Sequence, residues 1–182
     1  MKFLKFLVAT GVAMAVTMFM VAPAEAQPTE GQQVVQTLTG LEQARINNLV
    51  GEVTAAKVLA NQMWVETQGA IQQGLEPDPV FIATGDILVI LANVAVVQGN
   101  ALKATADQHF NTANAHWTNT NYGMAVTSYN KAFLDYAKSS VYFTSAEQDY
   151  TRATDDYTMS LMGVLADPMD DPVDPMDDPM AP

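Results

Sequence analysis

The clearest pattern along the chain is a sevenfold repeat of aromatic residues between positions 122 and 157. The large side chains at this spacing are Tyr122, Tyr129, Tyr136, Phe143, Tyr150 and Tyr157. Small residues lie between them, at Ala125, Ala132, Ser139, Ala146, Ala153 and Ser160. Large and small residues that alternate by three and four positions share one helix face and are typical of a coiled-coil-like seam. The pattern predicts one continuous helix over residues 121–165, packed along its length.

A second long helix is predicted over residues 79–117. Its large positions are Ile82, Val89, Val96, Lys103, Phe110 and Trp117, and its small positions are Gly85, Ala92, Gly99, Ala106 and Ala113. Small residues on one helix can receive the rings of another, so we expect the two helices to be antiparallel partners. The stretch from Ile87 to Val97 is apolar on nearly every side, which predicts the central helix of the bundle. A membrane span is the competing interpretation, but the apolar residues between Asp86 and Gln98 are fewer than the roughly 20 that a span needs.

A third helix is predicted over residues 40–73, because Thr39 and Glu42 have the spacing of a capping box. Its small and apolar positions step by three and four along the chain, at Ile46, Leu49, Val53, Ala56, Ala60, Met63, Thr67 and Ala70. Gly74 is expected to end this helix, and Asp78 followed by Pro79 predicts the start of the next one. The predicted fold class is all-α, an elongated antiparallel three-helix bundle with a coiled-coil-like seam.

The two ends of the chain differ from the helical part. Lys2 and Lys5 precede a long uncharged stretch, and the small-residue triplet at 24–26 offers a cleavage site, so residues 1–26 are predicted to be a Sec-type signal peptide. Residues 167–182 hold six aspartates and five prolines in a tandem seven-residue repeat, which predicts a disordered acidic tail. The helical bundle is expected over residues 27–166, in the periplasm or outside the cell, without membrane attachment after cleavage.

Composition excludes several kinds of chemistry. The chain has no cysteine, so thiol catalysis and thiolate zinc sites are ruled out, and stability is expected to come from packing. It has 20 acidic against 8 basic residues and a net charge of −12, which repels phosphate backbones and anionic lipids, so we predict no nucleic-acid partner. No nucleophile motif or glycine-rich phosphate loop is present, so we predict neither enzymatic activity nor a cofactor.

Three groups of residues are candidates for metal binding. His109 and His116 share a helix face but lie too far apart to chelate one ion alone. In the tail, Met169, Met176 and Met180 could offer thioether ligands to cuprous ion. The tail aspartates could hold calcium, although the glycine turn and closing glutamate of a calcium loop are absent. The tyrosine stripe is interpreted as core packing, with hydroxyl groups that reach water or backbone partners at the bundle edge.

These observations predict an exported, non-enzymatic helical bundle that binds another exported protein or its own copies. The long seam and the lack of catalytic groups favour this hypothesis. The alternative is a carrier of a small ligand or metal ion, which would use a pocket between helices around His109, His116 and Trp117, or the Met/Asp tail.

Overall fold

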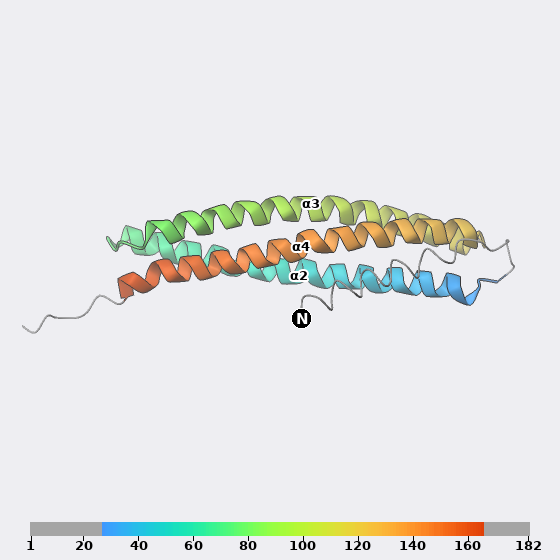
Figure 1. The fold of residues 1–182 in the computed structure, drawn as a ribbon, viewed down its shortest axis with the longest axis horizontal. Coiled ribbons are helices and arrows are strands. Elements are labelled where there is room, and N and C mark those ends of the chain that lie inside the picture. The colour runs from blue at the N-terminus through green and yellow to red at the C-terminus, as the bar shows by residue number, and fades with distance from the viewer. Residues whose placement is uncertain (1–26, 166–182) are drawn as a thin grey trace, which may run out of the picture.

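Three long helices make up the part of the chain that the computed structural model describes, residues 27–165 (Figure 1). They are α2 (Glu30–Gln72), α3 (Pro79–Thr118) and α4 (Tyr122–Leu165). The all-α prediction is confirmed, and residues 27–165 contain no strand. The helices lie side by side in an elongated bundle, each about 60 Å or more in length at a rise of ~1.5 Å per residue. The predicted signal peptide at 1–26 and the predicted tail at 167–182 lie outside the described residues.

The first helix begins at Glu30 and not near residue 40. Thr29 is its N-cap: the Thr29 hydroxyl accepts from the backbone N–H of Gln32 at 3.3 Å, and the Gln32 side chain accepts from the Thr29 N–H at 2.8 Å. Thr39 is buried inside the helix, where its hydroxyl donates to the carbonyl of Val35 at 2.8 Å. The prediction of a cap at Thr39 was wrong because Thr29 and Gln32, ten residues earlier, have the same capping-box spacing and start the helix. Burial along α2 already repeats every seven residues from that earlier start, at Gln32, Thr39, Ile46, Val53, Ala60 and Thr67.

Short turns reverse the chain between neighbouring helices. In the first turn Gly74 has a φ of 81°, a left-handed conformation that glycine adopts without strain after a helix end. Asp78 then caps α3 with its carboxylate, as predicted, and its backbone N–H donates to the carbonyl of Ser160 at 3.1 Å. This bond ties the turn to the far end of α4. In the second turn, over residues 119–121, Thr120 has a positive φ of 57°.

The central helix of the bundle is α4, not α3. Both α2 and α3 pack along α4, whereas α2 and α3 hardly approach each other. The prediction that Ile87 to Val97 forms the centre was therefore wrong. The residues that α3 buries are small, namely Gly85, Ala92, Ala95, Gly99, Ala106 and Ala113. The physical reason is register: the small positions of α3 face the rings of α4. Leu88, Val89 and Val96 pack partly buried against the same core, and six other large aliphatic residues of α3 are more than half exposed.

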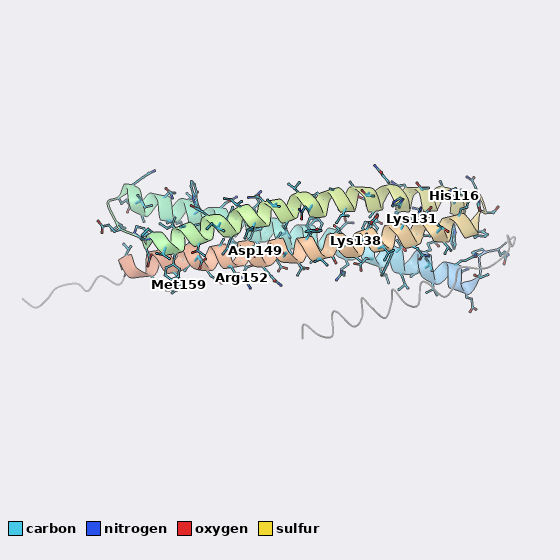
Figure 2. The ribbon with its side chains drawn as sticks, turned by 45° about the horizontal axis from the view of Figure 1, so that its top comes forward. His116, Lys131, Lys138, Asp149, Arg152 and Met159 are labelled. Carbon is cyan, nitrogen blue, oxygen red and sulfur yellow. The ribbon has the colours of Figure 1, made fainter. Side chains whose placement is uncertain are left out.

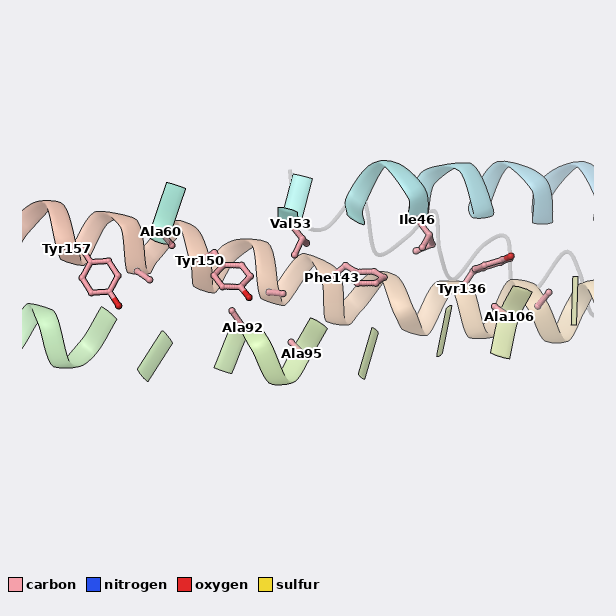
Figure 3. Packing of buried hydrophobic residues seen from close by; sticks show 13 residues of the cluster. Ile46, Val53, Ala60, Ala92, Ala95, Ala106, Tyr136, Phe143, Tyr150 and Tyr157 are labelled. Carbon is pink, nitrogen blue, oxygen red and sulfur yellow. The ribbon is translucent and has the colours of Figure 1, made fainter. Parts of the chain in front are cut away.

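Rings of α4 pack directly against two glycines of α3. A Cβ atom added at Gly85 would lie 2.7 Å from the ring of Tyr157, and one added at Gly99 would lie 3.0 Å from the ring of Phe143. The contact at Gly85 is too short for a Cβ atom unless the Tyr157 ring moves, and the contact at Gly99 is unusually tight, so glycine at these positions lets α3 lie close to α4. Figure 3 shows four rings in sequence along α4 with α2 on one side and α3 on the other, namely Tyr157, Tyr150, Phe143 and Tyr136.

Candidate interaction surface

The aromatic seam of α4 lies in the interior of the bundle. Five of its six rings are buried, at Tyr129, Tyr136, Phe143, Tyr150 and Tyr157, and Tyr122 is half-buried at the helix start. The six small residues between the rings are all buried as well, at Ala125, Ala132, Ser139, Ala146, Ala153 and Ser160. Each tyrosine ring is amphipathic, so burial of its carbon atoms leaves a hydroxyl group that needs a hydrogen-bond partner.

Side chains of α3 accept the hydrogen bonds of these phenols. Tyr129 donates to Asn114 at 2.6 Å and Tyr150 donates to Asn93 at 2.8 Å. In the same way Tyr157 donates to Asp86 at 2.7 Å, and Tyr136 donates to Asp107. The predicted partners, water or backbone at the bundle edge, were wrong for these four phenols. The reason is that each of these four rings meets a polar α3 side chain at the same height along the bundle.

A sequence signal for these partners existed and was missed. The acceptors on α3 repeat every seven residues in phase with the rings, and one further member of the series stands between them, giving Asp86, Asn93, Asn100, Asp107 and Asn114. We call these residues and their tyrosine partners the polar ladder. The ring at the height of Asn100 is Phe143, which has no hydroxyl, and Asn100 is exposed. The series of tyrosine hydrogen bonds is therefore interrupted at Asn100.

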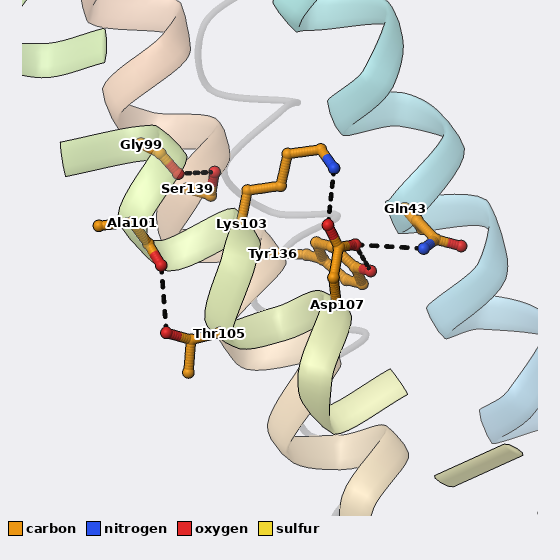
Figure 4. A network of polar contacts seen from close by, with 8 residues as sticks. All are labelled: Gln43, Gly99, Ala101, Lys103, Thr105, Asp107, Tyr136 and Ser139. Carbon is orange, nitrogen blue, oxygen red and sulfur yellow. Dashed lines mark hydrogen bonds and ion pairs between the residues drawn. The ribbon is translucent and has the colours of Figure 1, made fainter. Parts of the chain in front are cut away.

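Helix α2 joins the polar ladder from its other side. Gln36 donates to the Tyr129 hydroxyl at 3.1 Å, and Gln43 donates to Asp107 at 3.3 Å. Lys57 donates to Asn93 at 2.9 Å. Figure 4 shows the rung at Asp107, where Gln43, Lys103 and Tyr136 converge on one carboxylate. These long polar side chains bridge α2 to α3 although the two backbones are far apart.

The charges in this rung are fixed by their neighbours. Burial raises the pKa of Tyr136 well above its ordinary value, and the hydrogen bond to Asp107 and the charge of that carboxylate raise it further. Burial also acts to raise the pKa of Asp107, but hydrogen bonds from Lys103, Tyr136 and Gln43, with the positive charge of Lys103, lower it overall. A neutral phenol beside an ionised carboxylate is a stable donor and acceptor at neutral pH, which suits a structural role.

The structure does not join the two candidate histidines in one site. His109 is half-buried, and its Nε2 lies 3.8 Å from a carboxylate oxygen of Asp135. His116 is near the end of α3, and its backbone carbonyl accepts from Asn121 at 2.8 Å. Within residues 27–165 no group of three His, Cys, Asp or Glu side chains is placed to hold a metal ion. The candidates Met169, Met176 and Met180 lie outside the described residues.

Trp117, the third residue of the suggested pocket, belongs to an aromatic cluster. Its ring contacts Tyr122 edge-on at a centroid distance of 5.1 Å and Tyr129 at 6.0 Å. Phe110 contacts the other side of Tyr129 at 5.6 Å. Edge-to-face pairs of this kind stabilise packed cores. The cluster closes the end of the bundle where α3 turns into α4.

The outer face of α3 carries a continuous apolar surface. Six of its aliphatic side chains are each more than half exposed, and we call them the α3 strip: Val80, Ile87, Ile90, Leu91, Val94 and Val97. The most exposed are Val80 and Val97, at 69% each. No charged residue occurs on any side of α3 between Asp86 and Lys103. Large contiguous apolar surfaces are rare on monomeric soluble proteins and mark sites of interaction.

The same helix is long and apolar enough to cross a membrane, as judged by length and composition. Its most apolar window of 18 residues has a mean hydropathy of 2.3, and only 17% of that window is buried in the bundle. The apolar part of α3 is therefore longer than the residues between Asp86 and Gln98 indicate. The core helix of a soluble protein can be equally long and apolar, but it is mostly buried. The apolar window of α3 is mostly exposed.

The outward face of α4 differs from that of α3. Charged side chains occur along it from one end to the other, and Figure 2 shows Lys131, Lys138, Asp149 and Arg152 in order along the helix. Its exposed aliphatic residues, such as Leu134 and Val141, are single residues among polar neighbours. Scattered apolar residues of this kind are ordinary on protein surfaces. The α3 strip is therefore the more distinctive surface of the two.

Comparison with protein families, with curated proteins and with solved structures gave no match to this chain. The arguments about function therefore depend on the packing and the surfaces described above.

Proposed function

We propose that this protein is an exported, non-enzymatic interaction module that associates with protein surfaces through the α3 strip. The observation that supports the proposal is the exposure of six large aliphatic side chains on one face of a helix that carries no charge from Ile87 to Leu102. An apolar surface of this kind is stabilised when another apolar surface excludes water from it.

The strip is large enough to contribute usefully to binding. Full burial of one Val, Leu or Ile side chain contributes roughly 1.5–3 kcal/mol, and about half of each strip residue is still available, so the six together offer about 5–9 kcal/mol. A micromolar dissociation constant corresponds to about 8 kcal/mol. The strip thus supplies burial energy of that order before the cost of immobilising two molecules is subtracted.

The polar groups of the interior support a structural role and not a catalytic one. The carboxylate of Asp107 is already engaged by Lys103, Tyr136 and Gln43. The acceptors Asp86, Asn93 and Asn114 are likewise bonded to phenols of α4. Groups held in this way fix the register of three helices, since each bond forms only when the helices are aligned along their length.

Site-specific photocrosslinking in cells that produce the protein tests the proposal. A benzophenone amino acid in place of Val97 should give adducts of protein mass, because this position lies in the strip. The matched control is Val58, an equally apolar residue of α2 that is 60% exposed, which should give none. Adducts from neither position, or adducts with lipid alone, would contradict the proposal.

The carrier hypothesis stays a prediction. It concerns the region of His109, His116 and Trp117 and the methionines of the tail. Elemental analysis and native mass spectrometry of the purified protein would detect a metal ion or small molecule carried through purification, and mass equal to the bare chain would count against it.

A further inference from the structure

The α3 strip has the spacing of a second coiled-coil seam. Five of its six residues, with the exposed alanines in the same phase, step alternately by three and four: Val80, Ala83, Ile87, Ile90, Val94, Val97, Ala101 and Ala104. This seam covers more than three heptads and lies on the side of α3 that faces away from α4. Helices pair along such a seam with other helices of the same spacing, because knobs of one fit holes of the other. The best-matched partner is a helix that carries the same series.

We infer that the α3 strip binds the α3 strip of a second copy of this chain, in an antiparallel pair with a twofold axis near the level of Ala92. The inference rests on the proposed function and names the partner of the same surface. A twofold interface uses one patch twice, so the patch must be self-complementary. An all-aliphatic seam with no charge between Asp86 and Lys103 meets this requirement.

The positions of the large residues select the antiparallel register. When Ile87 lies opposite Val97 of the second copy, Ile90 lies opposite Val94, and the twofold axis repeats both contacts. These two isoleucines and two valines are then buried against one another, and Ala83 meets Ala101 at each end. Leu91 lies beside the seam close to the axis, where it meets its own counterpart.

Charge favours the same orientation. In a parallel pair Asp86 and Asp78 would each be level with the same residue of the second copy, so like charges would lie at the same heights along the two helices. In the antiparallel register Asp86 is level with Gln98 of the second copy, which is uncharged. The chain as a whole has a net charge of −12, so two copies repel each other over most of their surfaces. The uncharged part of α3 is where that repulsion is smallest.

A second copy fits the strip better than a bilayer does. The opposite face of α3 is packed against α4, and Asp86, Asn93 and Asp107 hold phenols of α4 there. Insertion of α3 as a membrane span would break these bonds and place the two carboxylates in or near hydrocarbon. The acidic surface also repels anionic lipid headgroups. Pairing with a second strip keeps every one of these bonds.

Single cysteines test the orientation, because the chain has none of its own. In the chain of residues 27–182, Leu91→Cys should form a covalent dimer with a short bismaleimide. In the antiparallel pair the two Leu91 positions are only about 3 Å apart along the direction of the helix axis. Val80→Cys is the matched control at the end of the same strip, where the counterpart is about 36 Å away along the axis at ~1.5 Å per residue. Dimers from Leu91→Cys alone support the antiparallel pair. Dimers from Val80→Cys, or from neither variant, overturn it.

Light scattering with charged variants tests the partner. Wild type should be a dimer, and Ile90→Asp should weaken the dimer by at least about 100-fold, because an unpaired carboxylate would be buried at the interface. Val58→Asp is the matched control on α2 and should leave the dimer unchanged. Circular dichroism should show equal helix content in all three, since both positions are exposed in the single chain.

The other occupants of the strip give distinct results. A wild-type monomer that floats with vesicles of phosphatidylethanolamine and phosphatidylglycerol would overturn the inference and the proposed function together. A wild-type monomer whose Val97 photocrosslinker captures a different protein would overturn the inference and leave the proposed function standing.

Discussion

Helices α3 and α4 have similar lengths and the same sevenfold spacing, yet they place their large apolar side chains on opposite sides, inside the bundle for α4 and on its surface for α3. On α4 the large rings face inward and the outer face is charged, as at Lys131 and Arg152. On α3 the buried positions are glycine and alanine, with Leu88, Val89 and Val96 partly buried beside them, and the six aliphatic residues of the α3 strip face outward. The more apolar of the two helices is therefore the peripheral one.

The difference shows that the phase of a repeat, more than its hydrophobicity, decides which residues a neighbouring helix covers. A ring on α4 needs a small residue opposite it, and Gly85 and Gly99 provide the space for Tyr157 and Phe143. Once α3 is held by these contacts, its aliphatic residues face outward because they occupy a different phase of the same repeat. The strip is thus a consequence of how α3 meets α4.

Removal of a seam ring should have the largest effect on the single chain. Phe143→Ala is expected to lower the free energy of unfolding by roughly 3–5 kcal/mol, because it leaves a cavity between helices. Val141→Ala, two residues away on the exposed face of α4, should change it by no more than about 0.5 kcal/mol. Urea unfolding followed by circular dichroism measures both. Equal losses at the two positions would contradict the inward orientation of the seam.

The glycines of α3 should give the next largest effect. Gly85→Ala places a methyl group against the Tyr157 ring, whereas Gly51→Ala on α2 meets no atom within 4 Å. Alanine favours a helix over glycine by about 1 kcal/mol at either position, so Gly51→Ala should stabilise the protein. Overpacking at Gly85 should make that variant less stable than Gly51→Ala by roughly 1–3 kcal/mol. A gain of stability at both positions would contradict the close contact of α3 with α4.

Alkaline pH should weaken the polar ladder. Burial first, and then the hydrogen bond and charge of a neighbouring aspartate, raise the pKa of Tyr136 and Tyr157 above the ordinary value of 10. Below pH 10 this stabilisation is complete. Above pH 10 the unfolded chain releases protons that the folded chain retains, so the free energy of unfolding falls as pH rises toward the folded pKa values.

Denaturant unfolding between pH 8 and pH 11.5 measures this loss. The double variant Tyr136→Phe/Tyr157→Phe is the control, and its free energy of unfolding should fall less steeply over the same range. Asp107 predicts the complementary acid behaviour: its pKa is lowered in the folded chain, so its contribution is lost as pH falls below about 4. Identical alkaline profiles for wild type and the double variant would contradict the buried phenol contacts.

The smallest effect should come from completing the ladder. Phe143→Tyr adds a hydroxyl at the height of Asn100, where the repeat has an acceptor and no donor. A new hydrogen bond would raise the free energy of unfolding by about 0.5–1.5 kcal/mol. The gain should disappear when Asn100→Ala is introduced as well, which a double-mutant cycle measures. A loss of stability on Phe143→Tyr would mean that the two positions do not face each other.

The sequence allowed much of this fold to be predicted, because strong periodicity determines local structure. The single helix from Tyr122 and the turn at Asp78 follow from aromatic spacing and from cap chemistry. The start of α2 was misplaced because two capping boxes of the same form lie ten residues apart and only the second was considered. Both Thr29 and Thr39 can cap a helix. Local sequence alone does not show that the helix begins at the first of them and that the second lies inside it on the buried face.

The central position and the candidate surface were harder to predict because they depend on contacts between helices. The run from Ile87 to Val97 indicated burial on all sides, but burial also needs neighbours, and in this bundle only α4 packs along α3. The partners of the phenols were visible as a repeat of Asp and Asn on α3, yet their alignment with the rings depends on the antiparallel register. The residues that lie at the same height on α3 and α4 depend on where the turn between the helices falls, and the structure places it at residues 119–121.

The central claim is that α3 in a single chain leaves an apolar seam that a second copy covers. The unfolding midpoint of residues 27–182, measured over a hundredfold range of protein concentration, tests it most directly. The account predicts that the midpoint rises with concentration for wild type, because dimer formation stabilises the folded chain, and that it is constant for Ile90→Asp. A wild-type midpoint that does not change with concentration would contradict the account.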